Sequence, residues 1–194
     1  AFDEDMHIAI VGGKRVRIRL ADDLREERSH SVSLSADLYH TFGKVQTNLL
    51  VEGFYTILDD VFALRDMDDA ADGGKVKERY NGSGATVRGF NVEGRAAFTR
   101  WFELQAGVTL QQSRYKEPEF RSEDAEVPPV RRMFRTPDAY GYFTASFKPV
   151  RNFTADLSGT CTGSMLVQHM AGSGVAQDVA VSTPSFFDMN IRLS

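Results

Sequence analysis

Apolar and polar residues alternate strictly from Gly89 to Leu110, on both sides of a short break at Thr99–Trp101. The even positions are apolar or small on both sides of the break, whereas the odd positions are mostly polar or charged. Successive side chains point to opposite faces of a β-strand. The pattern therefore predicts a β-hairpin with one apolar face and one polar face.

The same alternation recurs elsewhere in the chain. It covers a second hairpin from about Ser29 to Tyr55, with a turn near Gly43, and a third over 139–160, with a turn near Pro149. A last strand covers 185–194, and a shorter, weaker copy lies at Val16–Leu20. No segment shows a convincing helical period, so no helix is predicted.

The connections between the predicted strands alternate in length. Tight turns close the hairpins, whereas long polar segments join one hairpin to the next, over 66–84, 114–136 and 168–184. A meander with short turns at one rim and long loops at the other is typical of outer-membrane barrels. We therefore predict an all-β fold, an antiparallel up-and-down meander of about eight long strands, as part of a larger transmembrane β-barrel.

A soluble barrel also alternates, because its interior is packed and its exterior is solvated. The aromatic residues favour lipid as the partner of the apolar face, since a soluble core would place them in mid-strand. One group lies near the tight turns and another toward the opposite strand ends, as membrane interfaces select. The first group is Phe42, Phe98, Trp101, Phe102, Phe147 and Phe153, and the second is Tyr55, Tyr115, Tyr140 and Tyr142.

Arg88 is the residue that fits the lipid interpretation least well, because its even position places it on the apolar face. An arginine there costs about 2–4 kcal/mol at the bilayer midplane. Arg88 lies roughly 33 Å along the strand from Phe98 at a strand rise of 3.3 Å. We therefore expect Arg88 at the opposite membrane interface, where the cost nearly vanishes.

Composition narrows the function classes. The net charge of −4 gives no sign of a nucleic-acid partner, and the single cysteine, Cys161, rules out an internal disulfide. The four histidines share no metal-ligand spacing, and no nucleophile elbow occurs. We therefore expect no catalytic residues, no metal and no cofactor, and a protein that is not an enzyme.

Residues 81–115 resemble the C-terminal half of the barrel of a TonB-dependent receptor. The resemblance rests on Asn81, Gly84-Ala85, Gly89, Glu93, Leu104 and Gly107, in that order and spacing. The following hairpin adds Pro137 before its first strand and Gly163 after its second. The likeness covers residues 29–194.

The resemblance implies a barrel segment of a receptor that imports a scarce nutrient, such as an iron chelate, cobalamin or a glycan. It implies the outer membrane of a Gram-negative bacterium, with membrane lipid, a plug domain and TonB as partners. Residues 1–194 are then expected to be one barrel segment, with the plug domain and the terminal strands absent from this chain. The charged connection 114–136 is a candidate contact for substrate or for a surface lipoprotein.

Charged residues on the polar face are candidates for lining the barrel lumen. They are Asp37, Glu52, Glu93, Arg95, Glu103, Asp156 and Arg192. Two other interpretations of the pattern stay open. One is a complete small eight-stranded outer-membrane barrel that serves as an adhesin or anchor, and the other is a soluble lipocalin-like binding barrel.

Overall fold

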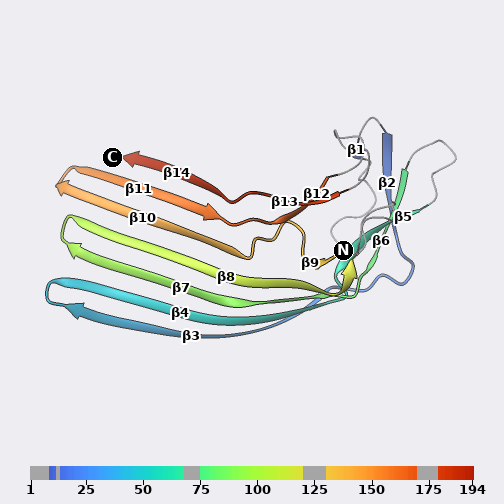
Figure 1. Cartoon of the computed structure of the whole chain (residues 1–194), viewed down its shortest axis with the longest axis horizontal. Helices are drawn as coiled ribbons and strands as arrows, with labels where there is room; N and C mark the ends of the chain where they lie inside the picture. The colour runs from blue at the N-terminus through green and yellow to red at the C-terminus, as the bar shows by residue number, and fades with distance from the viewer. Residues whose placement is uncertain (1–8, 12–13, 68–74, 120–129, 170–178) are drawn as a thin grey trace.

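The computed structural model describes residues 9–11, 14–67, 75–119, 130–169 and 179–194, and this part of the chain contains strands and no helix (Figure 1). A large curved sheet dominates the structure. Its long strands are β3 (Arg28–Phe42), β4 (Val45–Asp59), β7 (Ala85–Thr99), β8 (Phe102–Glu119), β10 (Ala139–Val150), β11 (Phe153–Thr162) and β14 (Phe186–Leu193).

The long strands follow one another across the sheet in chain order, and every neighbouring pair is antiparallel. The turns at 43–44, 100–101 and 151–152 all lie at the same end of the sheet (Figure 1). Gly43 has a φ of 64°, and a positive φ at the first of two turn residues suits a type II′ hairpin. The structure therefore confirms the predicted antiparallel meander.

The pairing register keeps the two faces of the meander separate across all the long strands. A row of residues at one depth is Ala36, Val51, Val92, Val108, Gly141, Cys161 and Phe187. We call the face that carries this row the apolar face and the opposite face the polar face. A slip of one residue in any pair would exchange the two faces, and no long pair shows such a slip in its central part.

The weak segment near Val16 differs from the prediction. It forms β2 (Lys14–Leu20), which pairs in parallel with β6 (Lys75–Asn81) in a separate sheet that also holds β1 (Ala9–Val11) and β5 (Phe62–Met67). The described meander thus has seven long strands, and the eighth strand of its sheet is the short β9 (Val130–Arg132).

The long connections contain strands of their own at the rim opposite the tight turns. β5 and β6 lie between β4 and β7, β9 lies between β8 and β10, and β12 (Leu166–His169) pairs with β13 (Val179–Ser182) between β11 and β14. These short strands gather at the rim that also holds the separate sheet (Figure 1).

The described residues enclose no packed apolar core. The buried apolar residues among them are Ala21, Ala63, Ala85 and Tyr115, whereas Val32 and Leu34 are 74% and 81% exposed. A soluble lipocalin-like barrel would bury its apolar face. The sheet is also open, because β3 and β14 are its edges and do not pair. Both features argue against the two alternative interpretations.

Four of the aromatic residues near the tight turns pack against one another. The ring centroids of Phe98 and Phe102 are 5.5 Å apart, and those of Trp101 and Phe147 are 5.3 Å apart. The second aromatic group is divided between the two faces. Tyr115, Tyr140 and Tyr142 have the register of the polar face, and only Tyr55 of that group lies on the apolar face.

Candidate functional site

The polar face of the meander is the candidate site, because it gathers the charged residues of the long strands. The register places all seven candidates on this face: Asp37 on β3, Glu52 on β4, Glu93 and Arg95 on β7, Glu103 on β8, Asp156 on β11 and Arg192 on β14. Their side chains do not form one cluster. Instead, neighbouring strands join them in small groups.

Glu93 lies at the centre of a group that spans three strands. The hydroxyl of Tyr142 on β10 donates to Glu93 Oε2 over 2.5 Å. The amide of Gln105 on β8 donates to Glu93 Oε1 over 2.8 Å and to the Tyr142 hydroxyl over 3.1 Å. Both oxygens of the carboxylate are therefore satisfied. This bonding ties β7, β8 and β10 together on the polar face.

Two further groups involve ion pairs or charges that face each other. Arg95 Nε donates to Glu103 Oε1 over 2.6 Å, which joins β7 to β8. Asp156 accepts from the Ser146 hydroxyl over 2.7 Å, and its register partner on β14 is Arg192. Cross-strand pairs of opposite charge stabilise a sheet by roughly 0.2–1 kcal/mol each.

The remaining two candidates are carboxylates held by uncharged neighbours. Asn91 donates to Glu52 Oε2 over 2.8 Å and accepts from the Thr109 hydroxyl over 2.8 Å. Asp37 accepts from the Tyr39 hydroxyl over 3.0 Å and from the Asn48 amide. Each carboxylate thus has a local donor that keeps it hydrogen-bonded on a half-exposed surface.

Sequence reasoning missed the uncharged members of these groups, above all Gln105, Tyr142 and Asn91. It selected residues by charge alone. The available signal was position, because all three have polar-face parity. Their partners could not be named from parity, since Tyr142 and Glu93 are 49 positions apart.

Tyr142 reaches Glu93 across β8 because residue 107 has no side chain. A Cβ added to Gly107 would lie 2.6 Å from the Tyr142 ring. The ring therefore lies directly over the backbone of Gly107. This contact gives a physical reason for glycine at one of the positions that carries the family resemblance.

Replacing Gly107 with valine is expected to displace the Tyr142 ring and break its hydrogen bond to Glu93. The expected loss is about 1–3 kcal/mol of unfolding free energy, because the packing of the ring on Gly107 and a hydrogen bond to a charged carboxylate disappear together. Urea unfolding in lipid vesicles measures it. Gly94→Val is the matched control, since a Cβ at Gly94 meets no atom within 4 Å. Equal stability of the two variants would contradict the proposed contact.

Asn81, another residue of the resemblance, joins two chain segments at the rim opposite the tight turns. Its side-chain oxygen accepts from the backbone N–H of Arg25 over 2.6 Å. Its amide donates to the carbonyls of Arg25 and Asp60 over 2.9 Å and 2.7 Å. At the same rim, a hydrogen bond from Lys116 lowers the pKa of the Asp59 carboxyl below its usual value.

The described residues contain no group of three or more His, Cys, Asp or Glu side chains that could hold a metal ion. They also contain no helix that is both long and apolar enough to cross a membrane. What the polar face offers is a set of hydrogen-bonded acids and amides. Such groups can contact a polar solute by exchanging one hydrogen bond for another.

No family model and no curated protein matches the sequence. Solved structures of transporters do match the fold. The chain is similar to the copper transporter OprC, with 10% identity, a TM-score of 0.58 and coverage of 90% of this chain and 25% of that one. It is also similar to the ferric-catecholate import receptor Fiu from Escherichia coli K12, with 14% identity, a TM-score of 0.59 and coverage of 89% and 22%.

The outer membrane transporter YddB from Escherichia coli matches with 15% identity and a TM-score of 0.55, over 94% of this chain and 28% of that one. The chain therefore spans about a quarter of the length of these proteins. At such low identity the likeness concerns the fold. The fold of this chain matches a segment of an outer-membrane barrel protein, as the resemblance to TonB-dependent receptors predicts.

Proposed function

We propose that the chain is a barrel segment of an outer-membrane TonB-dependent receptor that imports a scarce nutrient by energised transport. The observation that carries this proposal is the register of the meander, which shows no slip in the central part of any long pair and keeps one face apolar and exposed and the other polar. An exposed apolar sheet face of this extent needs a partner, and membrane lipid is the partner that fits alternating strands.

The similar solved structures support the transport part of the proposal. Three of them are a copper transporter, a ferric-catecholate import receptor and an outer membrane transporter. We extend this role to the present chain, with an iron chelate, cobalamin or a glycan as the class of cargo. In such a receptor a plug domain and TonB act together with the barrel, and the location is the outer membrane of a Gram-negative bacterium.

In this proposal the seven charged candidates line the path of the cargo or contact the plug. Their hydrogen-bonded groups keep the inner wall wet, and each of the five carboxylates accepts a hydrogen bond, as the Glu93 group illustrates. No chemical conversion is part of this role, so the protein is a transporter and not an enzyme.

Spin labels at Leu157 and Ser158 test the proposal, because these consecutive residues of β11 have the same depth and opposite faces. The label at 157 is expected to collide with lipid-soluble oxygen, and the label at 158 with a water-soluble relaxing agent. The protein is used at its natural length in outer-membrane vesicles. If the label at 157 is shielded from both agents, the apolar face packs against protein and the membrane role is wrong.

A further inference from the structure

One cavity lies within the wall of the meander, at the point where β8 changes its neighbour. β10 pairs with β8 as far as Leu110, and β9 pairs with it from Arg114 onward. The cavity, which we call the slot, has a volume of about 370 Å³. Its described lining includes Gln111, Gln112, Ser113, Arg114, Arg132 and Asp138. The slot therefore occupies the place of a missing neighbour of β8.

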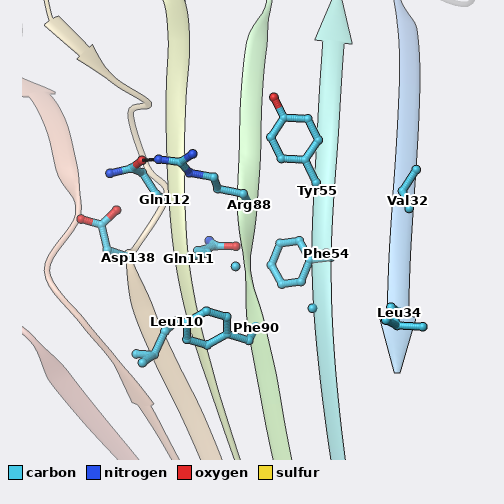
Figure 2. Close-up of a pocket in the computed structure, with 12 residues that line it drawn as sticks. Val32, Leu34, Phe54, Tyr55, Arg88, Phe90, Leu110, Gln111, Gln112 and Asp138 are labelled. Atoms are coloured by element: carbon cyan, nitrogen blue, oxygen red, sulfur yellow. Dashed lines mark hydrogen bonds between the residues drawn. The ribbon is translucent and has the colours of Figure 1, made fainter. Parts of the chain in front are cut away.

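The slot lies in the plane of the sheet and not on one of its faces. Gln111 and Ser113 have the register of the polar face, whereas Gln112 and Arg114 have that of the apolar face. Figure 2 shows Gln111 and Gln112 at this break in the pairing, with Asp138 beside them. Residues of both faces line one cavity because no described strand pairs with β8 on this side between the end of β10 and the start of β9.

Two polar groups that line the slot are buried without a hydrogen-bond partner among the described residues. They are the hydroxyl of Ser113, a residue that is only 2% exposed, and the Nε of Arg132. Arg132 uses its Nη2 instead, which donates to the carbonyl of Ser164 over 2.8 Å and pairs with Asp138 over 3.1 Å. Buried donors without acceptors are costly and rare in folded proteins. The two groups therefore indicate an acceptor that the described residues do not supply.

The charges around the slot indicate that this acceptor is an anion. Arg114 on β8 and Arg132 on β9 are direct cross-strand partners. Like charges in this position destabilise a sheet. Asp138 is the one carboxylate among the described lining residues, and it pairs with Arg132. The lining therefore keeps an excess of positive charge beside the two donors that lack acceptors.

We propose that the slot binds a small inorganic oxyanion of the class of phosphate or sulfate. The anion accepts hydrogen bonds from the Ser113 hydroxyl and from Arg132 Nε, and its charge offsets the repulsion between Arg114 and Arg132. Guanidinium groups match the oxygens of such an anion in charge and geometry. A free anion fits better than a lipid headgroup, because the buried hydroxyl belongs to the polar face.

The bound anion bridges β8 and β9. It thereby fastens β9, which ends the charged connection 114–136, to the wall of the meander at the point where the pairing changes. This role goes beyond the proposed function, because it concerns the assembly of the wall and does not depend on which cargo is transported.

Equilibrium dialysis of the protein at its natural length, in a non-ionic detergent, against radiolabelled inorganic phosphate tests the inference. Ser113→Ala is expected to weaken phosphate binding about tenfold, because a hydrogen bond to a charged group is lost. Ser158→Ala is the matched control, since Ser158 lies on the polar face of β11 and does not line the slot. The control is expected to leave the affinity unchanged.

A second variant tests the charge of the slot. Arg114→Gln is expected to weaken phosphate binding about fivefold, as the loss of one exposed ion pair does. Arg100→Gln, at the tight-turn rim, is its control and is expected to bind phosphate like the unaltered protein. Because Arg114 is exposed, this pair decides the question even if the Ser113 variant does not fold.

Urea unfolding in lipid vesicles distinguishes a bound anion from a bound water molecule. Without phosphate, Ser113→Ala is expected not to lower the urea midpoint, because the hydroxyl that it removes has no partner among the described residues. With phosphate, the midpoint of the unaltered protein is expected to rise, since a ligand that binds only the folded state stabilises it. The midpoint of the Ser113 variant is expected to rise less.

Three outcomes would overturn the inference. Equal phosphate affinity in the variant and the control of either pair would show that the slot does not hold the anion. A lower urea midpoint of the Ser113 variant without phosphate would mean that water already satisfies the hydroxyl. Displacement of bound phosphate by diphosphorylated lipid A would assign the donors to a lipid headgroup.

Discussion

Replacing Val108 with arginine is expected to lower the free energy of unfolding by about 2–4 kcal/mol, the cost of an arginine on the lipid face at the bilayer midplane. Val108 is 45% exposed on the apolar face, between Phe102 at the tight-turn rim and Gln112 toward the opposite rim. Because no packed protein covers Val108 among the described residues, the loss of unfolding free energy reports the environment of the apolar face itself. Urea unfolding of the protein at its natural length in lipid vesicles gives the value.

Two control variants separate depth and face from the general effect of a new charge. Val32→Arg lies on the same face at the level of Arg88, where the cost is expected to fall to about 0–1 kcal/mol. Thr160→Arg lies on the exposed polar face, one register row from Val108, and is expected to change stability little. A loss at Thr160 as large as that at Val108 would mean that the apolar face does not meet lipid.

Replacing Gly84 with alanine is expected to cost about 2–4 kcal/mol, because two separate penalties add. The φ of Gly84 is 89°, where a side chain is strained by about 1–3 kcal/mol. A Cβ would also clash with the carbonyl oxygen of Leu58, and the backbone would have to move to relieve this contact. Gly84 also accepts a hydrogen bond from the N–H of Lys116 over 3.0 Å, so the movement would disturb both β4 and β8.

Gly43→Ala separates the two penalties. Gly43 also has a positive φ, 64°, but an added Cβ there meets no atom within 4 Å. The Gly43 variant is therefore expected to lose only the conformational part, and the difference between the two variants gives the cost of the clash. The measurement is again the urea midpoint in vesicles, and a smaller loss at Gly84 than at Gly43 would contradict this account.

The family-like positions near β7 have different physical origins in the structure. Asn81 makes hydrogen bonds to two distant backbone segments. Gly84 has a positive φ, which favours glycine, and Gly107 leaves room for the ring of Tyr142. The order of these residues predicts the fold. Their individual roles depend on contacts with residues that are far away in the sequence.

The dependence on distant contacts also explains which contacts at the rim the sequence did not predict. The connection 114–136 reads as a charged segment, and its pattern gives no sign that Arg132 pairs with Asp138 or that Ser113 is left without a partner. A gap lies beside Ser113 because β10 leaves β8 beyond Leu110 and β9 joins it at Arg114. The alternation of apolar and polar residues does not show where one strand replaces another as the neighbour of β8.

The sequence by itself determined which residues share a face, where the tight turns lie and that the strands form an antiparallel meander. These features depend on the two-residue period of a strand, which is local. Only the tertiary structure decided which residues meet across the strands, such as Tyr142 with Glu93. The physical reason is that a shift of two residues between neighbouring strands leaves both faces unchanged but replaces every cross-strand partner, so the alternation cannot distinguish one such register from the next.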